Sequence, residues 1–230
     1  MTDIKHTKRE YDKFAEEYHA HLLNPNRNKW HKYVEKPYLV KLLKNLIPGK
    51  KVLDLGCGSG IFTKDLVKFK PKRLIGLDLS EGLISIAKRE YKNIKFYQGD
   101  AKKTNFKNNE FDVIVSSLMV HYFNDLEPLF KEVSRLLKKR GEFIFSMHHP
   151  VMEVTHRLGV NGKKDKNKLI LKDYFKEEKY SWKLGKEMKN MIAYHHTFET
   201  IIQSLVKEGF VVENLFETRP KKILEKIDKK

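Results

Sequence analysis

Apolar runs and helical patterns alternate along the middle of the chain. Five short apolar stretches have the length and the bounding residues of buried strands: 51–55, 73–77, 94–98, 111–116 and 142–147. After the first of them, Ile61, Phe62, Leu66 and Phe69 recur at helical spacing. Because strands that alternate with helices form mostly parallel sheets, we expect an α/β fold built on a doubly wound sheet.

Capping residues mark the helices between these strands. Ser80 is expected to cap a helix that runs to about Glu90. Pro128 is typical of a first helical turn, and its helix is expected to run to about Lys139, with Gly141 at the C-terminal cap. These helices supply the crossover connections that parallel strands need.

Helical patterns also precede the first strand. Tyr11 and Tyr18 lie seven residues apart, on one face of a helix together with the apolar residues between them. A second helix is expected from about residue 37 to residue 46. We interpret residues 1–48 as a helical lid on the domain.

The alternation stops after the fifth strand. Residues 150–196 are polar and lysine-rich, and we interpret them as an insertion, a loop followed by a β-hairpin, that covers the site. Thr197 then caps a last helix that Gly209 ends, and Phe210–Phe216 is expected to form a final strand. Residues 221–230 read as a frayed helix or a loose tail.

These patterns predict a single domain over the 230 residues. No internal repeat or low-complexity linker divides the sequence. Its expected parts are a helical lid, a ligand-binding core, an insertion that caps the site, and a last helix with a strand and a tail: 1–48, 49–149, 150–196 and 197–230.

A glycine-rich turn follows the first strand, in residues 52–60 (VLDLGCGSG). Glycines let the backbone turn tightly and let a ligand lie against bare main chain. Gly56 and Gly58 fit the first two positions of the dinucleotide fingerprint, but Ile61 stands at the third. Asp54, two residues before the first glycine, would repel a pyrophosphate and would suit a ligand that carries positive charge.

The glycine turn resembles the first motif of the class I S-adenosylmethionine (SAM)-dependent methyltransferases, which share a Rossmann-like fold. The resemblance implies SAM as the cofactor and S-adenosylhomocysteine as its product. It also implies that Asp54 helps to hold the amino-acid end of SAM above the turn of Gly56, Cys57 and Gly58. The cofactor half of the resemblance spans roughly residues 50–147.

Two more aspartates follow predicted strands in the order that this cofactor needs. Asp78 lies 20 residues after Gly58, where a carboxylate accepts hydrogen bonds from ribose hydroxyls. Leu79 would lie against the adenine. Asp100, in a stretch that resembles the family's third motif, would accept from the adenine amino group, and Ala101 would add a backbone contact. As alternatives, Asp78 is an ordinary strand-end carboxylate and Asp100 a turn aspartate.

Polar residues after the fourth and fifth strands are candidates for the reacting end of the site. The stretch 111–118 resembles the family's fourth motif, with Ser116 at the carboxyl end of a strand. It lacks the Asn/Asp-Pro-Pro-Tyr/Phe string of amino-methylating enzymes. His121 and His148 are candidate proton acceptors, with the alternative that they only line the pocket. Two pairs of adjacent histidines, His148-His149 and His195-His196, could suggest a metal site. We predict none, because no cysteine or carboxylate lies at a suitable spacing from either pair.

The N-terminal helix also has a familiar string. Residues 11–18 (YDKFAEEY) resemble a helix that closes over SAM in similar methyltransferases, where its tyrosines reach the cofactor. Tyr11 and Tyr18 are therefore candidate cofactor contacts, and the alternative is that both rings only pack. Tyr194 to Thr197 resemble part of the tail of bacterial small-molecule methyltransferases, with His196 where an arginine is usual.

Composition limits the partners and the compartment. The net charge is +17, from 47 basic and 30 acidic residues, which leaves nucleic acid open as a partner, although no basic run alternates with aromatics as in an RNA-binding module. The single cysteine excludes an intramolecular disulfide. The sequence contains no stretch of 18 apolar residues, so we predict no membrane span and expect a cytoplasmic protein.

The sequence therefore predicts an enzyme that transfers a methyl group from SAM, most simply to a small molecule. An RNA or protein methyltransferase that uses the basic surface is one alternative, and a SAM-binding protein without turnover is another. A nicotinamide oxidoreductase is disfavoured by Asp54 and by Ile61 at the third glycine position.

Overall fold

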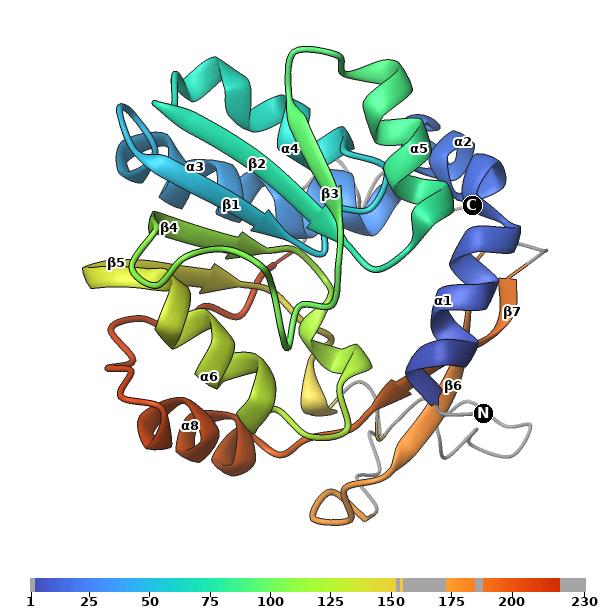
Figure 1. Cartoon of the computed structure of the whole chain (residues 1–230). Coiled ribbons are helices and arrows are strands. Elements are labelled where there is room, and N and C mark those ends of the chain that lie inside the picture. The colour runs from blue at the N-terminus through green and yellow to red at the C-terminus, as the bar shows by residue number, and fades with distance from the viewer. Residues whose placement is uncertain (1–2, 152–153, 155–172, 185–187, 220–230) are drawn as a thin grey trace.

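The computed structural model describes residues 3–151, 154, 173–184 and 188–219. Its centre is a parallel sheet of five strands (Figure 1). In their order across the sheet the strands are β3 (Lys95–Gln98), β2 (Arg73–Asp78), β1 (Lys51–Leu55), β4 (Phe111–Ser116) and β5 (Leu137–Phe145). The strand order reverses at β1, so β1 and β4 flank the switch point where such sheets bind ligands.

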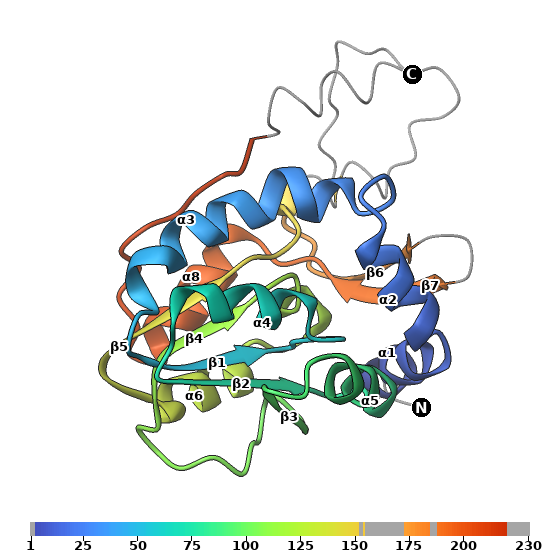
Figure 2. The same cartoon turned by 90° about the horizontal axis from the view of Figure 1, so that it is seen from above.

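Helices cover both faces of the sheet (Figures 1 and 2). One face carries α3 (Lys36–Leu46), α4 (Ile61–Leu66) and α5 (Glu81–Glu90), and the other carries α6 (Glu127–Leu136) and α8 (Phe198–Lys207). Both layers pack on alternate residues of the strands, so the central strands β1 and β4 are buried on both sides. In the part of the chain that the structure describes, no helix is both long enough and apolar enough to cross a membrane.

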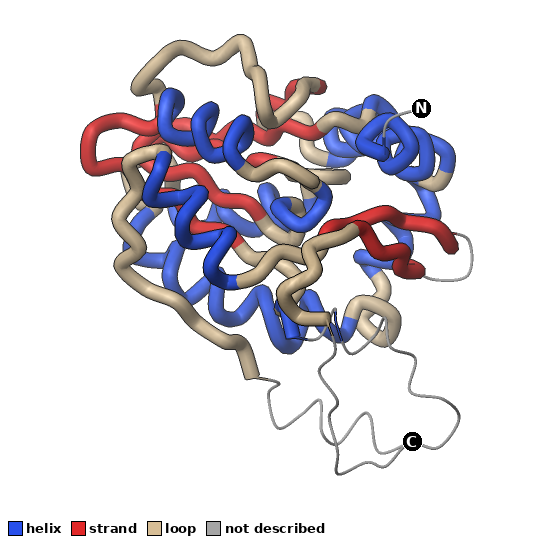
Figure 3. The backbone as a smooth tube through the Cα atoms, turned by 90° about the horizontal axis from the view of Figure 1, so that it is seen from below, coloured by secondary structure: helices blue, strands red, loops and turns tan. Residues whose placement is uncertain are grey.

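The N-terminal helices and a hairpin lie beyond the carboxyl ends of the strands. Helices α1 (Asp3–Lys13) and α2 (Ala15–Leu23) come first, followed by a π-helical turn at His31–Glu35. The hairpin of β6 (Lys179–Leu184) and β7 (Met188–Tyr194) lies beside α1 (Figures 1 and 3). This part of the insertion and the helical lid thus meet above the same edge of the sheet.

Local signals in the sequence explain most of these elements. All five strands of the sheet are confirmed, with ends that shift by a few residues at most, except for the start of β5. The hydroxyl of Ser80 accepts a hydrogen bond from Leu83 N at 3.1 Å, and that of Thr197 accepts from Thr200 N at 3.1 Å, so both predicted N-caps are confirmed. Gly209, with φ of +83°, stands just beyond the end of α8.

The predicted boundary between α6 and β5 was wrong. The helix ends at Leu136 rather than near Lys139, and Gly141 lies inside β5 instead of capping the helix. Leu137 already has extended backbone, and it pairs with Phe111 at the start of β4. A bulge then shifts the register between Phe111 and Val113 of β4. Residues 137–139, which the sequence assigned to the helix, therefore belong to β5.

The predicted last strand was also wrong. Residues 210–219 follow α8 without strand pairing to any described element. Only Phe210 packs onto the core, beside Phe143 at a ring distance of 6.0 Å, while Val211 and Leu215 are exposed. A β-strand needs a partner for its backbone groups, and apolar residues alone do not provide one. The expected tail at 221–230 and the loop at the start of the insertion lie largely outside the described residues.

Candidate cofactor and acceptor site

A cleft opens at the carboxyl edge of the sheet, beneath α1 and the hairpin. It brings together all but one of the residues that the sequence singled out for the site: Tyr11, Tyr18, Asp54, Gly56, Cys57, Gly58, Asp78, Leu79, Asp100, Ala101, His121 and His148. Ser116 is the exception, because it is fully buried and does not line the cleft. Its neighbour Ser117 lines the cleft instead.

The glycine turn forms the floor of this cleft. Gly56 and Gly58 have φ of +79° and +54°, a conformation that side chains rarely adopt. A Cβ on Gly56 would lie 2.4 Å from Met119 Cγ, whereas a Cβ on Gly58 would lie 3.6 Å from Tyr18 Cε1. Cys57 turns its side chain into the core, where burial raises the pKa of the thiol well above its usual value. Only its backbone is therefore available to a ligand.

Asp78 ties the glycine turn to the end of β2. Its Oδ2 accepts a hydrogen bond from Gly58 N at 2.8 Å, and its Oδ1 accepts from Ser80 N at 2.9 Å. Burial raises the pKa of the carboxyl, and the two backbone hydrogen bonds act in the opposite direction. Each carboxylate oxygen keeps a second lone pair, so Asp78 can fix the turn and still accept from the hydroxyls of a ribose.

Asp78→Asn is expected to weaken binding of S-adenosylhomocysteine by roughly tenfold to a hundredfold, because an amide accepts fewer and weaker hydrogen bonds than a carboxylate. The protein should remain folded, since removal of a buried charge offsets the loss of one backbone contact. Calorimetric titration of the variant measures the effect, and Asp125→Asn, at an exposed carboxylate that accepts from Glu127 N, is the control. Equal affinity of wild type and Asp78→Asn for S-adenosylhomocysteine would show that Asp78 does not bind the ribose.

Asp54 is a buried carboxylate at the end of β1, beside the glycine turn. The residue is 1% exposed; its Oδ2 accepts from Thr63 Oγ1 at 2.6 Å, while Oδ1 has no hydrogen-bond partner among the described residues. Burial raises the pKa of Asp54 to about 7, and repulsion from Asp78 and Glu35 adds to the rise. A buried anion without a full set of donors fits a ligand that brings a positive group.

The cleft has a further carboxylate that the sequence did not reveal, Glu35. It ends the π-helical turn and receives hydrogen bonds from Ser117 Oγ at 2.6 Å, from Ser146 Oγ and from His31 Nδ1. Burial acts to raise the pKa of Glu35, but the hydrogen bonds from His31 and the serines outweigh it and lower the pKa. Glu35 thus stays ionised and fastens the lid to the ends of β4 and β5. No motif marks it, although π-turns are frequent at functional sites.

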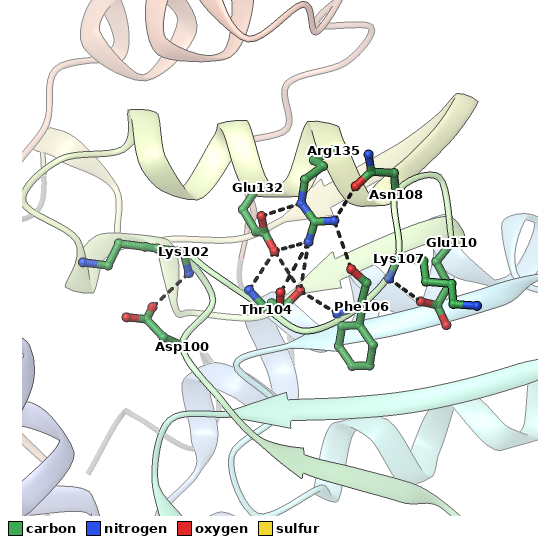
Figure 4. Close-up of polar contacts among 9 residues, drawn as sticks. All are labelled: Asp100, Lys102, Thr104, Phe106, Lys107, Asn108, Glu110, Glu132 and Arg135. Carbon is green, nitrogen blue, oxygen red and sulfur yellow. Dashed lines mark hydrogen bonds and ion pairs between the residues drawn. The ribbon is translucent and has the colours of Figure 1, made fainter.

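The third aspartate lies on a loop that helix α6 holds in place (Figure 4). Asp100 and Ala101 follow β3, and Asp100 Oδ1 accepts from Lys102 N at 2.9 Å. Further along the loop, Glu132 Oε1 accepts from Thr104 N at 2.8 Å and from Thr104 Oγ1 at 2.7 Å.

Arg135 completes this contact from the next turn of the helix. It donates to both oxygens of Glu132, to Phe106 O at 3.0 Å and to Asn108 Oδ1 at 2.6 Å. Glu132 and Arg135 together, which we term the loop brace, fix the backbone that carries Asp100 and Ala101.

Glu132→Gln is expected to loosen this loop. The variant keeps one acceptor but loses the charge that pairs with Arg135, so we expect a loss of about 1–3 kcal/mol in the free energy of unfolding. The affinity for S-adenosylhomocysteine should fall by a few fold because the adenine edge of the cleft is less well fixed.

Chemical denaturation and titration calorimetry measure the two effects. Glu127→Gln on the same helix is the matched control, since Glu127 pairs with Lys207 at the surface and does not contact the loop. A Glu132→Gln protein as stable as this control would contradict the brace.

Asp12 and Tyr11 of α1 also make hydrogen bonds across the cleft. Asp12 Oδ1 accepts from Ser80 Oγ at 2.6 Å and from Gly82 N at 3.1 Å, which docks α1 on α5. Tyr11 and Tyr122 share a hydrogen bond of 2.6 Å between their hydroxyls. Burial, before any other effect, raises the pKa of Tyr11, Tyr18 and Tyr122 well above the usual value, so all three are neutral phenols. No motif in the sequence marks Tyr122 as a site residue, apart from its position next to His121.

The two candidate proton acceptors lie face to face. The rings of His121 and His148 stack at 3.8 Å with an interplanar angle of 11°. His121 is 1% exposed, and burial followed by repulsion from His148 and His196 lowers its pKa well below the usual value, so the ring is neutral. His148 Nδ1 is hydrogen-bonded to Tyr180 Oη at 2.8 Å. Within the described ranges, no three His, Cys, Asp or Glu residues are grouped so that they could hold a metal ion.

The chain is similar to known methyltransferases in sequence and in structure. A family model described as a methyltransferase domain matches residues 53–145. A proposed SAM-dependent methyltransferase from Listeria monocytogenes is 32% identical, with a TM-score of 0.67 over 79% of this chain and 87% of that chain. A SAM-dependent methyltransferase from Mesorhizobium loti is 27% identical, with a TM-score of 0.70 over 83% and 88%.

A curated relative with a named reaction matches a shorter stretch. The demethylmenaquinone methyltransferase of Chlorobaculum parvum is 35% identical over 91 residues, which is 40% of this chain and 38% of that protein. The similarity to this protein therefore covers less than half of either chain, whereas the similarity to the two solved structures covers most of the chain.

Proposed function

Because the chain belongs to the SAM-dependent methyltransferases, we propose that it transfers the methyl group of SAM to a small molecule. SAM is the cofactor of this family. The acceptor is the proposed part. The observation that carries it is the hydrogen bond between Tyr11 and Tyr122, which joins the lid to the far wall of the cleft. A roofed chamber of this kind suits a compact acceptor better than a polymer. The name of the relative from Chlorobaculum parvum, a demethylmenaquinone methyltransferase, favours the same class.

The residues of the cleft fit the chemical groups of SAM. Asp54, with one oxygen that has no hydrogen-bond partner among the described residues, would face the ammonium group of the amino-acid end. Asp78 would accept from the ribose hydroxyls beside the bare backbone of Gly58, which leaves room for a ligand under Tyr18. Leu79, Asp100 and Ala101 would border the adenine. These roles rest on the placement of the side chains and on the family resemblance.

When bound, SAM supplies a methyl group on a sulfonium, which a nucleophile can attack without further activation. The task of the chain is then to hold the acceptor in line, to exclude water and to receive a proton where the acceptor has one to lose. His121 and His148 stand at the acceptor side of the cleft, and one of them would take that proton.

A transfer assay separates the proposed acceptor class from its rivals. The protein and labelled SAM are incubated in parallel with the small-molecule filtrate of a cell extract, with total tRNA and with the protein fraction. We expect label in a small molecule. Label in RNA that falls steeply with added salt would instead favour a role for the basic surface. Binding of SAM without label in any fraction would favour a protein without turnover.

A further inference from the structure

Six rings gather where the lid, the end of β5 and the hairpin meet. We term them the aromatic cluster: Tyr11, His121, Tyr122, His148, Tyr180 and Trp182. All six line the cleft. The Trp182 ring stands edge-on to His148 at 5.3 Å and to His121 at 6.5 Å. Tyr122 lies tilted at 4.5 Å from His121.

The aromatic cluster contains no carboxylate, lysine or arginine. The phenols of Tyr11 and Tyr122 are neutral, and burial keeps the His121 ring neutral as well. Flat apolar faces bind planar rings by stacking and edge contacts, whereas a charged group placed among them would lose its hydration without gaining a partner. The lining therefore favours a planar and uncharged ligand.

Three nitrogen atoms in the cluster are buried and lack a hydrogen-bond partner among the described residues: Nδ1 and Nε2 of His121, and Nε1 of Trp182. Buried polar atoms of folded proteins almost always have partners, and each atom left without one costs about 1–3 kcal/mol. Trp182 Nε1 can only donate, and a neutral histidine has one acceptor nitrogen. One hydroxyl group can partner two of these three atoms, because its oxygen accepts from Trp182 Nε1 while its hydrogen is donated to the acceptor nitrogen of His121.

We propose that the methyl acceptor is an uncharged aromatic compound with a ring hydroxyl, bound against Trp182 and His121. The hydroxyl oxygen accepts from Trp182 Nε1, and the hydroxyl hydrogen is donated to His121. The aromatic ring of the acceptor lies among the rings of the cluster. This inference rests on the proposed function, since it specifies the acceptor of the same cleft.

The resulting transfer step balances. The O–H bond of the acceptor breaks and its proton passes to His121, while an oxygen lone pair forms the new O–CH₃ bond. The S–CH₃ bond breaks and its electron pair stays on sulfur, which yields neutral S-adenosylhomocysteine and an aryl methyl ether. His121 then returns the proton to solvent. The acceptor reaches both groups from the cleft that His121 and Trp182 line.

Four probes of similar size test the acceptor class by calorimetry, with the protein saturated with S-adenosylhomocysteine. They are 2-naphthol, 2-methylnaphthalene, 2-naphthoate and the saturated alcohol decahydro-2-naphthol. We expect 2-naphthol to bind about tenfold more tightly than the methyl analogue, as one or two hydrogen bonds predict, and more tightly than the other two. Binding of 2-naphthoate as tight as that of 2-naphthol, or no binding of 2-naphthol, overturns the inference.

A pair of tryptophan variants assigns the hydroxyl contact. Trp182→Phe keeps a ring but loses the donor, so 2-naphthol should lose about fivefold to tenfold in affinity while 2-methylnaphthalene stays unchanged. Trp30→Phe, at a tryptophan that is 65% exposed, is the control. An unchanged preference for the hydroxyl in Trp182→Phe contradicts the contact. If Trp182→Phe does not fold, the comparison of probes on the wild type decides.

The first titration separates this inference from the function beneath it. If S-adenosylhomocysteine itself does not bind, the proposed function fails. If it binds and 2-naphthol does not, only the acceptor class fails.

Discussion

Asp54→Asn is expected to stabilise the ligand-free protein by about 2 kcal/mol at a pH of about 8, and at the same time to weaken SAM binding about a hundredfold. The pKa of Asp54 is raised to about 7. Ionisation of this buried carboxyl above that pH therefore costs about 4 kcal/mol relative to a group with a normal pKa. An asparagine avoids the charge and still accepts from Thr63, although its buried NH₂ group offsets part of the gain.

The pH dependence has a defined sign. The folded-state pKa of Asp54 lies above the usual value of 3.8, so the stability that the protonated group provides is complete below about pH 4 and is lost as the pH rises toward about 7. Asp54→Asn has no such loss, so its advantage should disappear at about pH 5. Binding of a cation to wild type should also weaken below about pH 7, as Asp54 takes up a proton.

Thermal or urea unfolding at the two pH values measures the stability, and calorimetry measures the binding. Asp112→Asn is the control, and its stability is expected to change in the opposite direction. Asp112 accepts from Lys51 N at 2.8 Å and from Lys138 Nζ at 2.7 Å, and these bonds lower its pKa despite partial burial. That variant should lose stability at neutral pH. An Asp54→Asn protein that is no more stable at about pH 8 than wild type would show that the charge is already compensated.

Gly58→Ala is expected to abolish measurable binding of S-adenosylhomocysteine while the protein stays folded. The added methyl group would enter the space between the glycine turn and Tyr18, with its nearest protein atom at 3.6 Å, so it strains no packed neighbour. It would occupy the floor of the cleft, where the cofactor is proposed to lie against bare backbone. The positive φ of 54° adds a backbone cost of about 1–2 kcal/mol.

Gly49→Ala separates that backbone cost from the loss of space. Gly49 has a φ of +71°, and a Cβ there would meet nothing within 4 Å. Both variants should therefore lose similar stability in denaturant unfolding, but only Gly58→Ala should lose the ligand in calorimetry. Retained binding in Gly58→Ala would place the cofactor elsewhere.

The cofactor half of the fold could be predicted from sequence because its signals are local. Each parallel strand is a short apolar run. Asp54 and Asp78 lie at the ends of β1 and β2, and Asp100 comes two residues after β3. The carboxyl ends of parallel strands share one edge, so order along the chain became proximity in the cleft. Ser80 and Thr197 were recognisable as caps for the same reason.

The reacting half could not be predicted, because its contacts join residues far apart in sequence. The pairs Tyr11–Tyr122 and His148–Tyr180 depend on how the lid and the hairpin settle on the sheet. Glu35 is likewise placed by hydrogen bonds to serines that follow two different strands. The strand predicted after α8 was wrong for a related reason. The apolar residues of this segment are typical of a strand, but a strand also needs a partner that is distant in sequence.

Paired titrations with S-adenosylhomocysteine and with NAD, in the same buffer, test the central claim most directly. A carboxylate-lined cleft over bare glycine backbone is built for a nucleoside without phosphate. We expect one equivalent of S-adenosylhomocysteine to bind with a clear heat, and NAD to give none. Binding of NAD alone would contradict the assignment of the cleft and, with it, every role given above to Asp54, Gly58 and Asp78.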